Sequence, residues 1–225
     1  PGGYGFYGVA DVLSGAANPS GHLADTYVVT NANAPSAQNY GDLEWTNANA
    51  EISMNSELVE AENIYIGYKY YETRYADTVL GQGNASDPVG SSTGSAWNYD
   101  SEVTYPFGYG LSYTTFTQTL DDLTVDTNQN TITAKVTVTN TGSVAGKDVA
   151  QLYVSLPYTD YDKEHAVEKS AIQLVDYEKT KELAPGESQT LTITTDLQNI
   201  ASWDSTSDNA IGTKGNYILD AGDYY

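Results

Sequence analysis

The chain has 225 residues, of which 30 are acidic and 9 are basic, and its formal net charge is -21. Such a surface repels a phosphate backbone or an anionic membrane, so the composition argues against nucleic acid and membranes as partners. There is no cysteine, and the only histidines, His22 and His165, are far apart without a second ligand at metal-binding spacing. The sequence therefore predicts no disulfide, no metal site and no cofactor.

The two ends of the chain indicate a piece of a longer polypeptide. It begins with Pro1-Gly2-Gly3 and stops on Tyr224-Tyr225, strand-forming residues with no turn after them. No apolar run reaches membrane-spanning length, and no secretory leader pattern occurs at the start. The compartment stays open, with a secreted or cell-surface location favoured over a cytoplasmic one.

Residues 6–13 predict a short helix. Val9, Val12 and Leu13 have the spacing of one helical face, and Gly15 is a typical helix stop. If this helix is separated from the sheet that it normally covers, these apolar side chains lack a partner. We therefore expect the first thirty residues to be poorly packed or to dock on another chain.

The segment from residue 22 to about residue 114 predicts little regular structure. Residues 22–29 have an extended pattern, and residues 31–56 have no sustained period, which is typical of a long surface connection. Residues 62–75 are rich in tyrosine and predict a strand or two rather than a helix. Residues 81–101 are rich in Gly and Ser and predict a loop or insertion.

From Thr115 onward, short alternating strands predict a mainly β fold. Residues 131–139 place Ile132, Ala134, Val136 and Val138 on one face and polar residues on the other. Further strands are expected at residues 148–155, 171–179, 188–195 and 216–225, while residues 204–209 are expected to form a turn. Such a series predicts an antiparallel sandwich of the immunoglobulin or fibronectin type III kind.

Four segments in order resemble glycoside hydrolase family 3. They are a Pro-Gly loop, helix and Asn-Pro-Ser-Gly turn in residues 1–23, the Glu-Asn-Ile and Gly-Tyr-Lys-Tyr pattern in residues 62–71, the junction motif in residues 106–116, and residues 138–187. The junction motif, Pro106 to Phe116, is the most specific, because it fits at every position. The resemblance covers nearly the whole chain apart from the loops at 31–56 and 81–101.

The resemblance implies a division of the chain into three parts. Residues 1–30 are expected to be the C-terminal remnant of the family's α/β sandwich domain. Residues 31–114 are expected to be a connecting or wrapping segment with tyrosine-rich strands and the Gly/Ser-rich loop. Residues 115–225 are expected to form the fibronectin type III-like sandwich, truncated at its last strand.

The resemblance also implies that the parent is a retaining, exo-acting β-glycosidase, most often a β-glucosidase. Such enzymes use a nucleophilic and an acid/base carboxylate that lie about 5–5.5 Å apart. In the family the nucleophile is an Asp on a barrel domain, and the acid/base is a Glu that precedes the Pro-Gly loop. Neither position is present in this chain, and Glu60, Glu62 and Glu72 have no identifiable catalytic partner. We assign no catalytic residue and expect the isolated chain to be inactive.

Aromatic residues are the remaining candidates for binding. Trp97 and Tyr99, in the polar loop, are candidates for contacts with the rim of a substrate site, because no core role is evident for them. The tyrosines at positions 65, 68, 70, 71 and 75 suit packing or a sugar subsite wall, and packing is favoured.

Two functional hypotheses follow. In the first, the chain is the non-catalytic part of the glycosidase, whose partners are the remaining catalytic domains and, through them, a β-linked glucoside or xyloside. In the second, the β-sandwich is a carbohydrate-binding, surface-binding or spacer module. The helix, the Asn-Pro-Ser-Gly turn and the junction motif favour the first hypothesis, because a free-standing module has no use for them.

Overall fold

The computed structural model describes residues 4–38, 62–81 and 97–225. The chain divides into two compact units. Unit 1 comprises residues 4–22, 109–167 and 173–225, and unit 2 comprises the described residues of 23–108 together with residues 168–172. Within the described part of the chain, no helix is long and apolar enough to cross a membrane.

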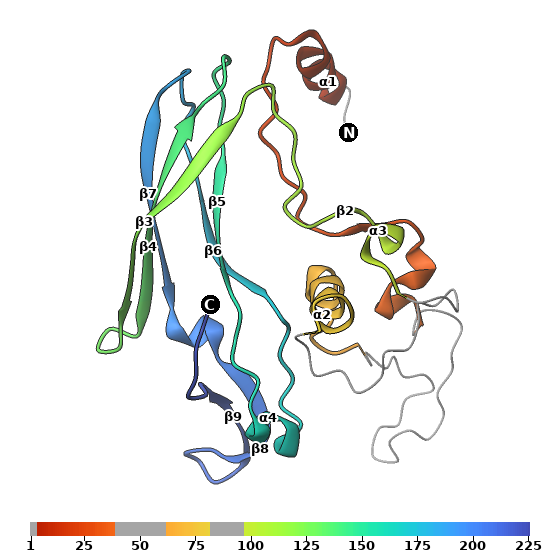
Figure 1. Ribbon diagram of the computed structural model, residues 1–225, viewed down its shortest axis with the longest axis vertical. Coiled ribbons are helices and arrows are strands. Elements are labelled where there is room, and N and C mark those ends of the chain that lie inside the picture. The colour runs from red at the N-terminus through yellow and green to blue at the C-terminus, as the bar shows by residue number, and fades with distance from the viewer. Residues whose placement is uncertain (1–3, 39–61, 82–96) are drawn as a thin grey trace. The chain divides into compact units, whose positions relative to one another are not determined.

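Unit 1 is built on an antiparallel β-sandwich (Figure 1). One sheet has the strand order β3 (Phe116–Asp126), β4 (Thr131–Asn140) and β7 (Ser188–Asp196). The other pairs β5 (Val149–Val154) with β6 (Gln173–Lys179). A separate hairpin joins β8 (Ser202–Asp208) to β9 (Lys214–Ile218). Two short helices, α4 (Asp160–His165) and η3 (Leu197–Ile200), belong to the same unit. The predicted mainly β, fibronectin type III-like class is confirmed.

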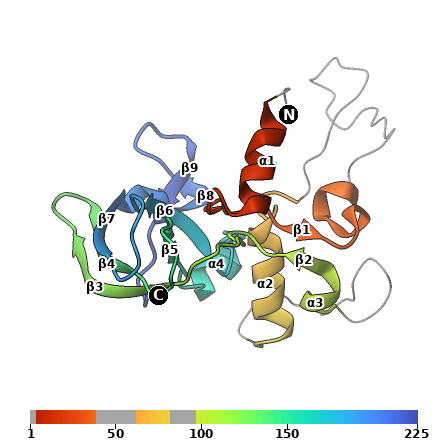
Figure 2. The same cartoon turned by 90° about the horizontal axis from the view of Figure 1, so that it is seen from above.

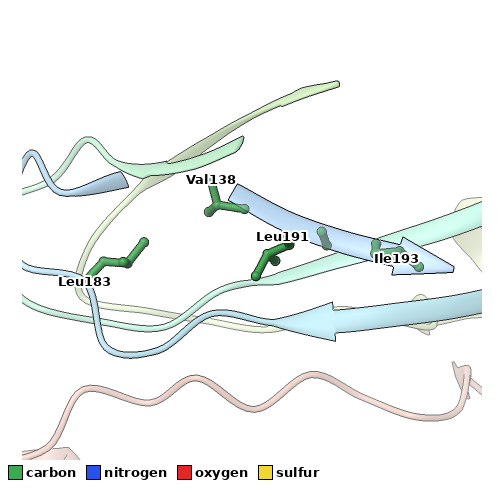
Figure 3. Close-up of a cluster of buried hydrophobic side chains, with 5 residues drawn as sticks. Val138, Leu183, Leu191 and Ile193 are labelled. Atoms are coloured by element: carbon green, nitrogen blue, oxygen red, sulfur yellow. The ribbon is translucent and has the colours of Figure 1, made fainter. Parts of the chain in front are cut away.

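The sandwich core lies between the two sheets. Val138 from β4, Ala150 from β5, Leu191 and Ile193 from β7, and Leu183 pack together and are at most 3% exposed (Figure 3). The predicted alternation of the strand at 131–139 is confirmed, because Ala134 and Val138 are buried on its inner face. Apolar burial of this kind is the main favourable contribution to the stability of the unit.

The last predicted strand is shorter than expected. β9 ends at Ile218, and residues 219–225 leave the hairpin. The terminal residue instead pairs through its backbone with the end of β5, since Ser155 and Tyr225 exchange N–H to C=O hydrogen bonds of 2.7 and 3.1 Å.

Residues 204–209, predicted to be a turn, lie largely in β8, so that prediction is wrong for the strand residues. The turn chemistry is nevertheless present inside the strand, where the pairing with β9 is irregular between Asp204 and Asp208. One oxygen of the buried Asp204 accepts hydrogen bonds from the backbone N–H groups of Thr206 and Ser207, and the other accepts from Tyr161 Oη at 2.6 Å. Because these bonds favour the ionised form, they hold the pKa of Asp204 well below its usual range.

The predicted N-terminal helix is confirmed as α1 (Gly5–Ser14), which ends at Gly15 in the left-handed conformation, φ 78°. None of its residues is buried. Phe6, Val9 and Leu13 are 69%, 53% and 79% exposed, so the helix lacks a packing partner for its apolar face, as the sequence predicts.

Unit 2 is organised around a helix rather than the expected tyrosine-rich strands (Figure 2). It contains α2 (Tyr68–Thr78), the short helix α3 (Tyr99–Glu102), the strand pair β1 (Tyr27–Val28) and β2 (Val103–Tyr105), and the 3-10 turns η1 (Asn31–Asn33) and η2 (Pro35–Gln38). Residues 39–56 and 82–96 of the predicted loops lie outside the described residues.

The prediction of strands at 62–75 is wrong over the length of α2. Tyrosine has a high strand propensity, but tertiary packing overrides it here. Tyr71 is 2% exposed and packs with Trp97 and Val103, and Tyr75, one helical turn later, packs against the same cluster. The helix begins after Gly67, whose φ of 52° directs the chain into it.

Replacing Leu183 by Ala should lower the free energy of unfolding of the chain by about 2–5 kcal/mol, because Leu183 is completely buried and the substitution leaves a cavity. Leu120→Ala is the matched control, since Leu120 lies in β3 with 58% of its surface exposed. Urea unfolding followed by circular dichroism measures both. Equal losses for the two variants would contradict the position of the core.

Acid should destabilise unit 1 in part through Asp204. Its folded-state pKa is lowered, so its contribution is present above the pKa of an unfolded Asp and is lost as the pH falls towards the folded value. Asp204→Asn should therefore lower stability at neutral pH and flatten the decline between about pH 4 and about pH 2. Urea midpoints across this range test the expectation, and an unchanged acid slope in the variant would exclude Asp204 as its source.

Candidate functional site

The structure places the two candidate rim residues in an aromatic cluster of unit 2. Trp97 is 8% exposed and packs with Tyr71 and Val103, so it has the core role that the sequence did not reveal. Its ring contacts Tyr99 edge-on, with 6.1 Å between centroids. The Arg74 guanidinium lies 5.8 Å from the Trp97 centroid, which is within the range of a cation–π interaction. The burial of Trp97 favours packing, and a sugar contact by either residue stays a prediction.

Tyr99 is tied to the helix of the same unit. Its hydroxyl donates a 2.6 Å hydrogen bond to Glu72 Oε1, and its ring packs edge-on against Tyr75 with a centroid distance of 5.4 Å. Burial, followed by this hydrogen bond to Glu72, raises the pKa of Tyr99, so its hydroxyl remains a donor. Glu72 thus has a structural partner, as expected for a carboxylate that holds a neighbouring element in place.

A network of hydrogen bonds joins the N-terminal segment to the β-sandwich, and it is made by residues of the motifs that carry the family resemblance. Its central side chain is Asn18, in the Asn-Pro-Ser-Gly turn. Asn18 Oδ1 accepts hydrogen bonds from the Tyr113 backbone N–H at 2.8 Å and from Ser112 Oγ at 3.0 Å, and Asn18 Nδ2 donates to the Ala145 carbonyl at 2.9 Å. One amide therefore joins three chain segments, residues 18, 112–113 and 145, which we name the Asn18 clamp.

A second carboxamide, that of Asn140 at the end of β4, supports the clamp from inside. It is completely buried and makes four hydrogen bonds. Its Oδ1 accepts from Thr114 Oγ1 at 2.7 Å and from the Gly142 N–H at 3.1 Å, while its Nδ2 donates to the Val144 and Leu183 carbonyls. Because a buried amide is costly unless its hydrogen bonds are made, this arrangement admits one loop conformation.

Glycine makes the close approach at the clamp possible. A Cβ on Gly146 would lie 2.6 Å from Asn18 Nδ2, and a Cβ on Gly142 would overlap Thr114 Oγ1. Any side chain at either position would push these polar groups apart. The hydrogen bonds around positions 142 and 146 therefore require glycine at both positions.

Further contacts hold the same N-terminal segment. The hydroxyl of Tyr113 donates to the Val12 carbonyl of α1 at 2.7 Å, and Lys179 Nζ from β6 donates to the Ser20 carbonyl at 2.7 Å. His22 Nε2 lies 3.9 Å from Asp148 Oδ1, so these two side chains form an ion pair when the histidine is protonated. Although α1 itself is exposed, its end and the turn that follows are anchored on the sandwich.

Sequence reasoning found the motifs of this junction but assigned no role to Asn18, Thr114 or Asn140. The available signal was that polar residues stand next to glycines in two distant motifs, Asn18-Pro19-Ser20-Gly21 and Asn140-Thr141-Gly142. The signal did not give the partner of each residue, because the contacts join separate segments: Asn18 meets residues 94 to 127 positions away, and Asn140 meets Thr114 and Leu183, which are 26 and 43 positions away.

No group of three or more His, Asp or Glu side chains able to hold a metal occurs in residues 4–38, 62–81 and 97–225. His165 stacks on Tyr161 with a centroid distance of 3.9 Å, and its Nδ1 lies 2.9 Å from the Tyr161 carbonyl oxygen. What the junction does chemically is to hold one segment of the chain rigidly on another.

Replacing Asn18 by Ala should loosen the clamp, because the Tyr113 N–H loses its acceptor and the Ala145 carbonyl loses a donor. We expect the hydrogen exchange of the Tyr113 amide to accelerate by about tenfold or more, which corresponds to about 1.5 kcal/mol. Asn128→Ala, at an exposed position between β3 and β4, is the control. Unchanged exchange at Tyr113 in Asn18→Ala would contradict the role of the clamp.

Comparison with known proteins identifies both the sandwich and its context. Residues 148–224 match the model of the fibronectin type III-like domain. The structure shows that β3 and β4, which precede this match, complete one of the sheets.

The chain is 32% identical to β-glucosidase A of Butyrivibrio fibrisolvens over 230 residues, which covers 96% of this chain and 22% of that protein. The structure of a β-glucosidase from Paenibacillus barengoltzii matches with a TM-score of 0.69 and 33% identity, covering 97% of this chain and 19% of that one. That of a GH3 β-glucosidase from Bifidobacterium adolescentis matches with a TM-score of 0.67 and 28% identity, covering 98% and 25%.

The chain thus spans about a fifth of the length of the curated relatives that it matches. The match extends over both units and includes the junction motif that first indicated the family. The chain therefore corresponds to the part of a family 3 glycoside hydrolase that carries the fibronectin type III-like domain.

Proposed function

We propose that the chain is the non-catalytic part of a retaining, exo-acting β-glycosidase, and that it stabilises the catalytic domains and shapes the surroundings of their active site. The observation that carries this proposal is the combination, in one unit, of a firmly clamped N-terminal segment and an exposed apolar helix. The Asn18 clamp holds residues 18–22 on the sandwich, while α1 presents Phe6, Val9 and Leu13 outward.

The exposed face of α1 is the surface by which the chain would act. Three large apolar side chains on one short helix form a patch that water does not favour, and such patches mark sites where another protein surface packs. The occupant that we propose is the α/β layer of the catalytic part of the same glycosidase. The small share of its relatives that this chain covers leaves ample room for such a layer.

The clamp would make this docking useful to the enzyme. A helix attached through a flexible linker transmits little rigidity. The end of α1 and the turn after it are instead held by the Asn18 side chain and by the backbone carbonyls of Val12 and Ser20, which accept hydrogen bonds from Tyr113 and from Lys179 of β6. Because the stable sandwich holds the end of α1 in place, it would also hold in place the layer that docks on α1. A spacer module, the alternative considered from the sequence, would need neither feature.

Catalysis would come from outside the chain. Hydrolysis with retention needs a nucleophile and an acid/base about 5–5.5 Å apart. Glu72 accepts a hydrogen bond from Tyr99, and Asp204 accepts hydrogen bonds that keep it ionised in a structural role. These partners suit carboxylates that support the fold. The β-linked glucoside or xyloside substrate would be bound by the catalytic domains.

The isolated chain should not hydrolyse aryl β-glucosides or β-xylosides, while the full glycosidase should hydrolyse at least one of them. In the isolated chain, Leu13→Asp should change the free energy of unfolding by less than about 0.5 kcal/mol, because Leu13 is 79% exposed there. In the full enzyme the same change should lower the melting temperature and the activity, because it places a charge in the docking surface.

Ile211→Asp is the matched control, since Ile211 lies in the loop between β8 and β9 with 84% of its surface exposed. It should have little effect in either form of the protein. Turnover by the isolated chain would overturn the non-catalytic assignment. Indifference of the full enzyme to Leu13→Asp would overturn the docking role of α1.

A further inference from the structure

The β-sandwich of unit 1 has an uncovered apolar surface on its edge strand β3. Leu120, Leu123 and Val125 stand opposite residues of β4 in the β3–β4 pair, and the partner of Leu123 is the buried Ala134. Directly opposite residues of an antiparallel pair project from the same face of the sheet, so the three side chains lie on the inner face. They are nevertheless 58%, 55% and 55% exposed, so this part of the inner face lacks a cover.

The second sheet of the sandwich is too narrow to cover β3. It consists of β5 and β6, and among the strands of the described residues none pairs with the other edge of β5. That edge faces β3, because Gln118 Nε2 of β3 donates a 3.1 Å hydrogen bond to the Val149 carbonyl of β5. The position beside β5, above the apolar residues of β3, is therefore the place of a third strand of this sheet.

The chain already occupies the first position along this edge. Ser155 and Tyr225 exchange both backbone hydrogen bonds, and a Cβ on Gly222 would lie 2.8 Å from Pro157 Cβ. Residue 222 thus lies beside 157 and residue 225 beside 155, so the two segments run antiparallel. Alternate residues of a strand direct their backbone groups to the same edge, so the edge that Tyr225 meets continues to Gln151. Tyr225 has the hydrogen bonds of the first residue in an added strand.

Two features of this place select its occupant. The edge of β5 presents backbone N–H and C=O groups that can pair with another strand, which is the general basis of recognition by strand addition. The surface of β3 beneath it is apolar, and such a surface is matched by apolar side chains at alternate positions of the added strand. β5 has six residues, so a strand of matching length is about 20 Å long.

We propose that the edge of β5 and the inner face of β3 form an acceptor for one further β-strand, which continues the course of residues 222–225 antiparallel to β5. Val154 is buried, so the neighbouring Ser155 and its partner Tyr225 project from the outer face, where Tyr225 is 83% exposed. The first, third and fifth residues of the added strand then point inward onto β3. This inference does not rest on the proposed docking of α1, so either can fail without the other.

The test extends the full chain after Tyr225 by six residues, Val-Thr-Val-Thr-Val-Thr. The valines of this extension point inward, so it should raise the urea midpoint of the chain and slow hydrogen exchange of the Gln151 amide by about tenfold or more. The matched control is Thr-Val-Thr-Val-Thr-Val, which has the same composition. Since the Ser155–Tyr225 pair sets the register, the control directs its valines outward and should give neither effect.

Leu123→Asp tests the apolar surface of the acceptor. It should leave the urea midpoint of the unextended chain unchanged, because more than half of Leu123 is exposed there. In the chain that carries Val-Thr-Val-Thr-Val-Thr it should abolish the gain in midpoint, because it places a charge beneath the added strand. Thr119→Asp, at an exposed position on the other face of β3, should retain the gain.

Three outcomes would overturn the proposal. The first is an equal urea midpoint for the two extended chains, which would show that the direction of the valines is irrelevant. The second is a gain that survives Leu123→Asp. The third is a gain that grows with protein concentration, because the added residues would then pair with a second copy of the chain and not with their own β5. Size-exclusion chromatography of both extended chains checks this last outcome.

Discussion

The buried carboxamide of Asn140 is the interaction on which the rest of unit 1 depends. It stands where β4 leaves the sheet, and its four hydrogen bonds tie together the junction motif, the loop after β4 and the backbone of Leu183 in the core. An amide in this position is costly unless every hydrogen bond is made, so the loops around it have one acceptable arrangement. The same loops then present the Ala145 carbonyl and the Gly146 surface to Asn18.

This succession of contacts connects the hydrophobic core to the proposed function. Apolar burial between the two sheets makes the sandwich stable, Asn140 fixes the loops at its end, and the Asn18 clamp attaches the N-terminal segment to those loops. The apolar face of α1 is left outside. A stable domain that is firmly attached to a helix with an exposed apolar face is suited to pack against other domains of a larger protein. This agrees with the small share of the β-glucosidases that the chain covers.

The described part of unit 2 is held together mainly by aromatic rings around a short helix. Tyr71, Trp97 and Val103 form its core, and Tyr99 and Arg74 hold the rim of that core by a hydrogen bond and a cation–π contact. Trp97 and Tyr99, the candidates for a substrate rim, thus take part in packing, and a sugar contact by either stays a prediction.

The sequence by itself determined the sandwich class, the alternating strand at 131–139, the helix that ends at Gly15 and the family resemblance, because each depends on local periodicity, turn chemistry or a contiguous motif. It did not determine the helix at 68–78, where burial against Trp97 and Val103 outweighs the strand propensity of tyrosine. Nor could it show that Trp97 is buried, or that Asp204 sits inside a strand.

The Asn18 clamp was decided only by the tertiary structure. The partners of Asn18 come from segments 94 to 127 residues away in the sequence. No local pattern encodes such distances, since a hydrogen bond depends on where two groups meet in space and not on the residues beside them.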